Sequence, residues 1–268
     1  MGFRLSKIYV LLLAGALVFP VFSRTIVVPS KEARSIARAM AAARMGDTVL
    51  VRDGVYREHV LVAPGVLLMA ENPLKAVLDG RGRGNVVVMG NTSVISGFEI
   101  RNGTVGVYSE AAQAVIRRCR IINNHQSGVL SVGALPTIED NFIVYNKGSG
   151  IQGWDVRTTS GSVNHNTIAF NSNHGVSLGG TTAITLENNI IAFNNQFGVK
   201  PSEETVRVEL LNNNFFQNAR MSTHLPSGNI SADPQFVDPK RLNFNLGAGS
   251  QSIGMSTDNQ NLGARVLH

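Results

Sequence analysis

The chain has 268 residues, of which 43% are hydrophobic and 6% aromatic, with 27 glycines and a single cysteine. This length is enough for one sizeable domain or two small ones. A formal net charge of +6 is too weak to indicate a nucleic-acid-binding protein, and one cysteine excludes an internal disulfide.

The first 23 residues have the pattern of a secretory signal peptide. Arg4 and Lys7 form a positively charged start, and the apolar run from Ile8 to Phe22 follows. An uncleaved membrane anchor is the alternative, but a run of about 15 residues is shorter than the ~20 that a spanning helix needs. We therefore expect cleavage after Ser23 and export to the periplasm, the cell surface or the medium. Cleavage lowers the formal charge to +4, because only Arg4 and Lys7 carry charge in this segment.

One helix is predicted, shortly after the expected cleavage site. Ser30 is a suitable N-cap, the segment KEARSIARAMAAARMGD is rich in helix formers, and Gly46 is expected to end the helix. Ile36 and Met40 fall on one face of this helix, which makes it amphipathic. We expect residues 24–46 to form an N-terminal capping region.

A repeat of about 23 residues dominates the rest of the chain. Each copy has an aliphatic residue, Asn three residues later, an apolar residue two further, a second Asn three further, and then Gly with Val or Ile. The first Asn slot is filled by Phe98, Cys119, Asn141, Asn166, Asn189 and Asn213, so the copies are 21 to 25 residues apart. Such self-similarity is typical of a solenoid.

The residue types favour an all-β parallel β-helix over a leucine-rich repeat, because the Leu ladder and the helix in each copy are absent. The two aliphatic slots are five residues apart, and strand side chains alternate with a period of two. Both slots can face inward only if the chain bends between them. We expect this solenoid over residues 47–230 and a C-terminal capping segment over residues 231–268.

We expect different structural roles for the second Asn slot and for the Gly slot. Coils stack about 4.8 Å apart, so the Asn side chains can form a ladder that also caps turn amides. This slot contains Asn124, Asn146, Asn171, Asn194 and Asn218. The Gly slot contains Gly128, Gly150, Gly175 and Gly198, where we expect a positive φ. Cys119 is interpreted as a small buried filler.

Several stretches carry a family resemblance: GDTVLVRDGVYRE at residues 46–58, VLDGRG at 77–82, the Asn-x-Ile-x-x-Asn…Gly-Val coils, and DPQFVDPKRLNFNLGAGSQSIGMS at 233–256. With them the mature chain resembles the secreted right-handed parallel β-helix proteins of the pectate-lyase-like superfamily, in their carbohydrate-binding and sugar-hydrolase repeat branch. The resemblance implies a polysaccharide partner. It does not favour hydrolysis, because the paired aspartates of the hydrolases are absent and Asn173-His174-Gly175 only approximates their Gly-His-Gly.

Calcium is implied only by the resemblance to family lyases. Glu110, Asp155 and Glu203 lie on one loop side but two coils apart each, roughly 10 Å. Ca²⁺ needs several oxygens at about 2.3–2.6 Å. We therefore expect no metal and no cofactor.

Three residues directly before the first Asn slot form the candidate catalytic site. Arg118, Asp140 and His165 are expected to stack on successive coils. A cation, a carboxylate and a base in one row can abstract the proton beside a uronate carboxylate, as a uronan lyase or epimerase requires. The alternative is a cross-coil salt ladder, which Arg117 beside Glu139 would extend.

The longest loop between copies, at residues 152–162, is the first candidate for substrate binding. An exposed Trp154 can stack on a sugar ring, and Arg157 can pair with a uronate carboxylate. The alternative is that Trp154 packs on the coil below and that Arg157 neutralises Asp155.

A basic stripe at one turn is the second candidate for substrate binding. It contains His125, Lys147 and His174, which follow the first Asn slot by six or eight residues. The stripe can line an anionic chain, or it can be an ordinary solvated turn. Three functions remain open: binding of an acidic polysaccharide, a lyase or epimerase reaction on uronans, and a non-catalytic scaffold in the cell envelope.

Overall fold

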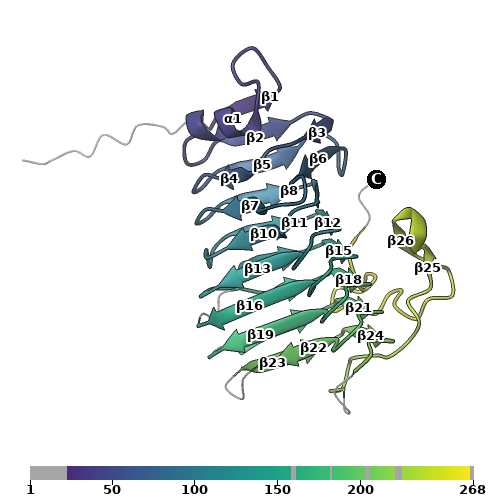
Figure 1. The fold of residues 1–268 in the computed structure, drawn as a ribbon. Coiled ribbons are helices and arrows are strands. Elements are labelled where there is room, and N and C mark those ends of the chain that lie inside the picture. Colours follow the sequence, from purple (N-terminus) through teal and green to yellow (C-terminus); the bar gives the residue numbers. More distant parts are fainter. Residues whose placement is uncertain (1–22, 158–160, 182, 203–205, 221–224, 266–268) are drawn as a thin grey trace, which may run out of the picture.

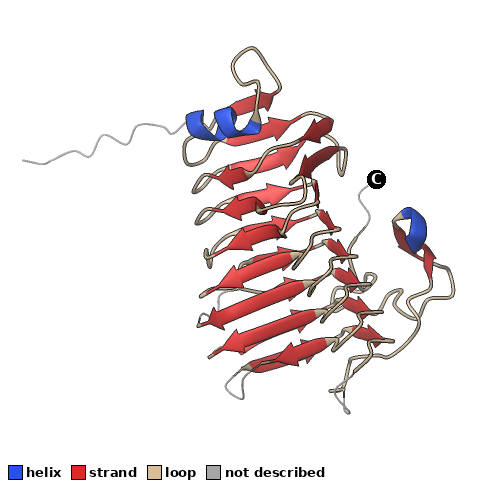
Figure 2. Cartoon of the chain, viewed as in Figure 1, coloured by secondary structure: helices blue, strands red, loops and turns tan. Residues whose placement is uncertain are grey.

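The computed structural model describes residues 23–157, 161–181, 183–202, 206–220 and 225–265. These residues form about eight stacked coils, and the coils contribute strands to three parallel sheets (Figure 1). Helix is confined to α1 (Ile36–Ala42) and the 3-10 turn η1 (Pro239–Arg241) within the described ranges (Figure 2). The predicted all-β parallel β-helix is therefore confirmed. The expected signal peptide lies almost wholly outside the described residues.

Each sheet runs along the length of the stack. Sheet A contains β1 (Thr25–Val28), β2 (Thr48–Val51), β5 (Leu67–Ala70), β8 (Val94–Ser96), β11 (Val115–Arg117), β14 (Thr137–Glu139), β17 (Val163–Asn164), β20 (Ala183–Glu187) and β23 (Arg207–Leu211). Sheet B contains β3 (Gly54–Tyr56), β6 (Ala76–Asp79), β9 (Glu99–Arg101), β12 (Arg120–Ile122), β15 (Phe142–Val144), β18 (Thr167–Ala169), β21 (Ile190–Ala192) and β24 (Asn214–Phe216). Sheet C contains β4 (Val60–Val62), β7 (Asn85–Met89), β10 (Val105–Ser109), β13 (Val129–Val132), β16 (Ile151–Val156), β19 (Val176–Gly180) and β22 (Val199–Pro201).

The core is a set of aligned aliphatic columns inside the coils. Ile116 of sheet A pairs with Ile95 and Ile138, and Ile121 of sheet B pairs with Ile100 and Ile143. All six side chains are fully buried. The predicted bend lies between the two columns, because the residue before the first Asn slot has a left-handed backbone conformation in successive coils, with φ of 53° at Arg118, 55° at Asp140 and 50° at His165.

Two asparagine ladders hold the turns at either end of sheet B. In the predicted ladder, the Asn171 Oδ1 accepts both the backbone N–H and the side-chain amide of Asn146, at 3.1 and 3.0 Å. The first Asn slot forms a second ladder, in which the Asn166 Oδ1 accepts the corresponding two groups of Asn141. Cys119 takes the place of one Asn and is fully buried, and burial raises the pKa of its thiol to about 12.

The prediction of a positive φ in the Gly slot is wrong. Gly128, Gly150, Gly175 and Gly198 are absent from the positive-φ residues. They are needed because the neighbouring coil leaves no space for a side chain. A Cβ at Gly150 would lie 2.5 Å from the Ile168 Cγ2 and 2.8 Å from the Gly175 carbonyl oxygen.

The predicted helix is shorter than expected and begins later. Its N-cap is Ser35, whose side chain accepts the Arg38 N–H, whereas the Ser30 hydroxyl accepts the N–H groups of Glu32 and Ala33 in a separate turn. The carboxylate of Glu58, from the first coil, accepts the N–H groups of the first helical residues, Ile36 and Ala37. Because Glu58 lies 21 or 22 residues from these N–H groups, a tertiary contact determines where the helix begins. The apolar face is as predicted, since Ile36 and Met40 are buried.

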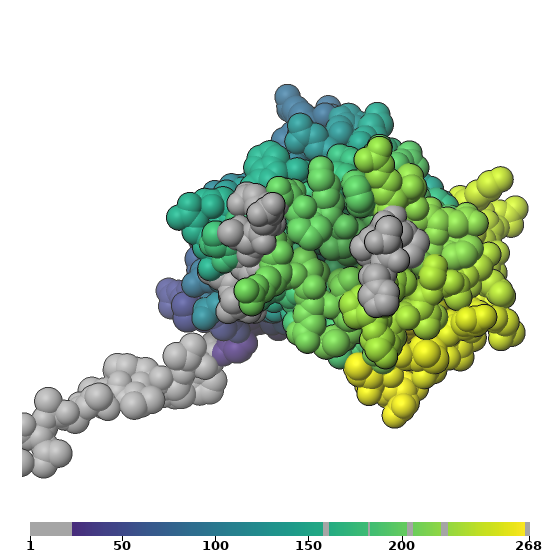
Figure 3. Space-filling model, turned by 90° about the horizontal axis from the view of Figure 1, so that it is seen from below, coloured from purple at the N-terminus to yellow at the C-terminus, as the bar shows by residue number. Residues whose placement is uncertain are grey.

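The C-terminal segment returns along the stack and covers the outer face of sheet B. Its hairpin, β25 (Phe236–Asp238) paired antiparallel with β26 (Asn243–Leu246), packs Phe244 against Phe142 at a ring-centroid distance of 5.7 Å. Viewed from below, this yellow segment lies along one flank of the molecule (Figure 3). The C-terminal segment therefore covers part of the outer face of sheet B with apolar side chains.

Candidate functional site

The corner between sheets A and B contains the column of Arg118, Asp140 and His165. Equivalent backbone hydrogen bonds tie Asp140 to the coil of Asn164 and His165 to the coil of Glu187, so these residues occupy matching positions on neighbouring coils. Arg118 is exposed, whereas Asp140 and His165 are only 5% and 7% exposed. The structure thus forms the predicted column but buries its carboxylate and its imidazole.

Both buried side chains contact the C-terminal strap, by which we mean residues 255–265. The Arg265 guanidinium donates two hydrogen bonds of 2.6 Å to the two carboxylate oxygens of Asp140. The Asp258 carboxylate lies 3.5 Å from the His165 Nε2 and 3.5 Å from the Arg265 Nη1. Asp140 therefore pairs with a residue 125 positions later in the chain rather than with Arg118. No local pattern in the sequence signals this partner.

These contacts limit the chemistry that the column supports while the strap is in place. Donating hydrogen bonds to Asp140 raises the pKa of Arg265, and the Ser256 hydroxyl together with His165 lowers the pKa of the Asp258 carboxyl. The guanidinium occupies both oxygens of Asp140, and the buried His165 Nε2 has no hydrogen-bond partner among the described residues. Neither group can reach a substrate proton in this arrangement.

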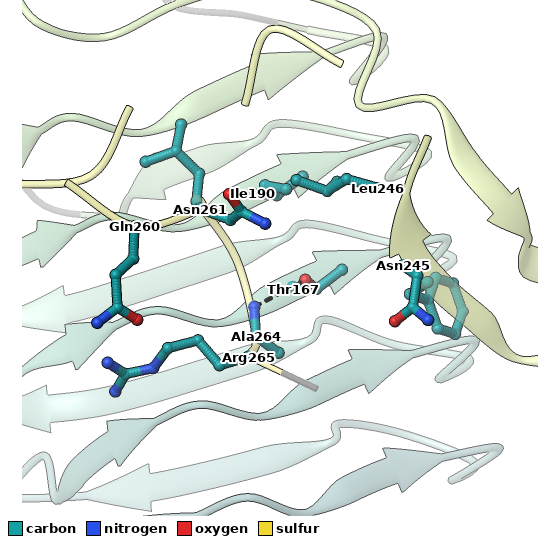
Figure 4. Close-up of a pocket in the computed structure, with 10 residues that line it drawn as sticks. Thr167, Ile190, Asn245, Leu246, Gln260, Asn261, Ala264 and Arg265 are labelled. Atoms are coloured by element: carbon teal, nitrogen blue, oxygen red, sulfur yellow. Dashed lines mark hydrogen bonds between the residues drawn. The ribbon is translucent and has the colours of Figure 1, made fainter. Parts of the chain in front are cut away.

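A cavity of about 470 Å³ lies beside the strap (Figure 4). Thr167 and Ile190 of sheet B line it together with Leu246 of the hairpin and Gln260 and Arg265 of the strap. The Thr167 hydroxyl accepts the N–H of Ala264 at 3.0 Å. This cavity separates the strap from the hairpin, although both lie over sheet B.

The outer face of sheet C is open along the described residues. Leu61 is 63% exposed and Trp154 is 52% exposed, while Tyr108 between them is half-buried and donates a hydrogen bond to Glu110. Trp154 pairs with Val132 in register and does not pack beneath another segment. The indole is thus available to a ligand on this face.

The remaining predicted residues of the 152–162 loop pair with each other. Arg157 donates hydrogen bonds of 2.9 and 2.8 Å to the two oxygens of Asp155, and both side chains are mostly exposed. Arg157 therefore neutralises Asp155, as the alternative interpretation had it, and a ligand carboxylate would have to compete for Arg157. Residues 158–160 of this loop lie outside the described residues.

The structure divides the predicted basic stripe. His125 and Lys147 are exposed at matching positions of the corner between sheets B and C. His174 belongs to a different column and is 8% exposed, and its Nδ1 accepts the Phe197 N–H at 3.2 Å. Burial and the charge of Lys200 lower the pKa of His174. The reason is its offset of eight residues rather than six, which places its ring against Phe197 of the next coil.

The same corner carries cationic residues that the stripe did not include. We define the basic ridge as His59, Arg81, Arg83, His125 and Lys147, which are all exposed. The His59 Nδ1 donates to the Asn85 carbonyl at 2.8 Å, and a Cβ at Gly82 would lie 3.7 Å from the His125 ring, so both rings border the turn that carries the arginines. Within the described residues, no ridge residue forms an ion pair with a carboxylate. The alternating Gly-Arg-Gly-Arg-Gly of residues 80–84 is the sequence signal from which Arg81 and Arg83 could have been predicted as part of this basic surface.

Among the described residues, no three His, Cys, Asp or Glu side chains come together in a group that could hold a metal ion. In the same part of the chain, no helix is long and apolar enough to span a membrane.

Known proteins share the fold at low sequence identity. The pectate lyase Pel9A superposes with a TM-score of 0.59 at 13% identity, over 92% of this chain and 97% of the lyase. An alginate lyase from Paenibacillus sp. str. FPU-7 gives 0.56 at 16%, over 73% and 77% of the two chains. A periplasmic alginate epimerase gives 0.50 at 15%, over 69% of this chain and 49% of the epimerase. No curated protein sequence matches the chain.

A family model described as a right-handed β-helix region matches residues 85–232. The matched range covers β7 to β24 and therefore both asparagine ladders. Since it includes more than half of the chain, this protein belongs to the right-handed parallel β-helix family.

Proposed function

We propose that this protein is exported and binds an acidic polysaccharide along the outer face of sheet C and the basic ridge. The observation that carries the proposal is the ridge itself: Arg81, Arg83 and Lys147 are exposed without a carboxylate partner among the described residues. Unpaired cations on a repeating scaffold attract a polymer whose charges also repeat. The ridge extends from the coil of His59 to that of Lys147, about 19 Å if coils are 4.8 Å apart.

The opposite margin of sheet C supports the same ligand class. Trp154 offers an exposed indole on which the apolar face of a sugar ring can stack. A glycan lying over sheet C would therefore meet aromatic stacking on one side and cationic groups on the other. The structural similarity to pectate and alginate lyases and to an alginate epimerase agrees with a uronan as the ligand.

A binding experiment tests this proposal. Pectate and alginate oligomers, with a neutral glycan as reference, are titrated into the wild-type protein and into an Arg83→Gln, Lys147→Gln double variant. We expect binding of the uronans alone, weakening with salt, and a loss of about tenfold or more in the double variant, because each ligand contact to a charged group is worth about 1.5–3 kcal/mol. Arg241→Gln is the matched control, since Arg241 is an exposed arginine remote from sheet C.

The indole gives a second readout in the same titration. We expect tryptophan fluorescence to change on uronan binding, because Trp154 is the single tryptophan of the chain. Trp154→Ala should weaken binding while leaving its salt dependence unchanged. Equal affinity of the double variant and the wild-type protein for both uronans would overturn the proposal.

A lyase or epimerase reaction at Arg118, Asp140 and His165 is the alternative function. It requires the C-terminal strap to leave the column, since Asp140 and His165 are buried beneath it. The same uronans are therefore assayed for an unsaturated product and for hydrogen exchange at C5. Turnover that Asp140→Asn and His165→Gln abolish would replace the binding proposal by the catalytic one. Binding of an envelope protein instead of a glycan would indicate a scaffold.

A further inference from the structure

The C-terminal strap crosses successive coils along the corner between sheets A and B. Four of the coil residues that it contacts each stand directly before a first Asn slot. The contacts run from the Met255 carbonyl on Asn212, through Thr257 on Asn188 and Asp258 on His165, to Arg265 on Asp140. The strap thus covers the column from its C-terminal end and stops short of Arg118.

Side chains hold the strap to the coils. Among the described residues, one backbone–backbone hydrogen bond joins strap and coils, from the Gly263 N–H to the Asn188 carbonyl at 2.8 Å. The other polar attachments are the hydrogen bonds of Thr257 to Asn188 and Glu187, the bond from the Asn212 amide to the Met255 carbonyl, the bond from Ala264 to the Thr167 hydroxyl, and the ion pairs. The Leu262 side chain is also buried, in a cluster with Ile190 and Ala192 of sheet B. The coils, in contrast, share continuous backbone ladders. A segment without such a ladder opens at a lower free energy than the body it rests on.

The ion pairs of Arg265 fix the C-terminal end of the strap to the coils. Arg265 links Asp140, which is buried, to Asp258, which is partly exposed. The side chains of Arg265 and Asp258 are 38% and 40% exposed, so salt can screen these pairs. The 470 Å³ cavity beside Gln260 and Arg265 leaves space next to this end. The strap end can therefore move without displacing the hairpin (Figure 4).

We propose that the C-terminal strap is a latch that opens at the Arg265 ion pairs. Closed, it shields Asp140 and His165. Open, it exposes them beside the Thr167 hydroxyl. A cationic group that competes for the Asp140 carboxylate, or a rise in ionic strength, favours the open form. The latch concerns the corner between sheets A and B, so it is independent of glycan binding on sheet C.

Three histidines of the chain report on the latch within one experiment. Diethyl pyrocarbonate modifies accessible neutral imidazoles, and peptide mapping measures each site separately. His125 is exposed and serves as the reference, His165 lies under the strap, and His174 is buried in a corner that the strap does not touch. The full-length wild-type protein is compared with Arg265→Gln, and Arg241→Gln is the matched control on the same C-terminal segment.

We expect wild-type His165 to react far more slowly than His125 at low salt. The ratio of the two rates should rise about tenfold to a hundredfold in Arg265→Gln, because the strap end then loses both hydrogen bonds that tie it to the buried Asp140. Added sodium chloride should raise the ratio in the wild-type protein, and free guanidinium should raise it further. His174 should stay protected throughout, and Arg241→Gln should match the wild-type protein.

Three results would overturn the latch. His165 reacting as fast as His125 in the wild-type protein would mean that the strap does not shield it. His165 staying protected both in Arg265→Gln and in a chain ending at Met255 would mean that another part of the protein buries it. Reaction of His174 together with His165 would mean that the strap opens only when the coils unfold.

Discussion

Sheets B and C are built by the same coils, but their outer faces differ. From β12 onward, sheet B presents Phe142, Val144 and neighbouring aromatic rings, and the hairpin covers them with Phe236 and Phe244. Sheet C presents the exposed Trp154 and Leu61, and the register between them contains both apolar and polar residues, namely Val88, Tyr108, Leu130 and Gln152. No described segment crosses this face (Figure 1). The repeat determines the inward residues of both sheets and leaves the outward residues free to specialise. An apolar outer face requires a cover, whereas a mixed face remains available to a ligand.

Removing an aromatic ring that covers sheet B should give the largest loss of stability. This substitution tests directly whether the outer faces of sheets B and C differ in their need for a cover. Phe244→Ala should lower the free energy of unfolding by about 3–5 kcal/mol, because Phe244 is 4% exposed and packs on Phe142 and Phe236. Leu61→Ala on sheet C is the matched control and should change it by less than about 0.5 kcal/mol. Urea denaturation measures both values, and similar values for the two variants would contradict the comparison.

Breaking the ladder that both faces share should give an intermediate effect. Asn171→Leu leaves the buried N–H of Asn146 without its acceptor and should cost about 1–3 kcal/mol for each group left unpaired. Asn195→Leu, at an exposed position one coil away, is the control and should be nearly neutral. Thermal denaturation compares the two variants with the wild-type protein. An unchanged melting temperature in Asn171→Leu would mean that the ladder does not stabilise the stack.

Protonation of His174, at the corner between sheets B and C, should give the smallest loss of stability. The pKa of His174 is lowered in the folded protein by burial and by Lys200, so folding favours the neutral ring, whose Nδ1 accepts the Phe197 N–H. The associated stability is present above the unfolded pKa of about 6.5 and is lost as the pH falls through the lower folded pKa. The melting temperature should therefore fall between pH 7 and pH 5, and less so in His174→Asn. Identical pH profiles for the two proteins would exclude this role.

The fold was largely predictable because its determinants lie within each copy of the repeat. An odd spacing between two aliphatic slots requires a bend, and the left-handed residues at Arg118, Asp140 and His165 supply it. The helix start was misplaced because Glu58, a residue of the first coil, caps its N–H groups. The Gly slot was misinterpreted for a related reason: Gly150 is required by the Ile168 methyl group of the next coil, not by its own φ.

The candidate site was less predictable, since it depends on contacts between distant segments. The sequence alone determined the coil, the ladder of the second Asn slot, and the column that contains Asp140 and His165, because strand alternation and turn chemistry act over a few residues. Tertiary structure alone decided that Arg265 covers this column, that His174 is buried against Phe197, and that Arg81 and Arg83 join His125 on one ridge. Stacking brings residues of different copies together at the coil spacing, and a returning tail adds partners that no repeat encodes.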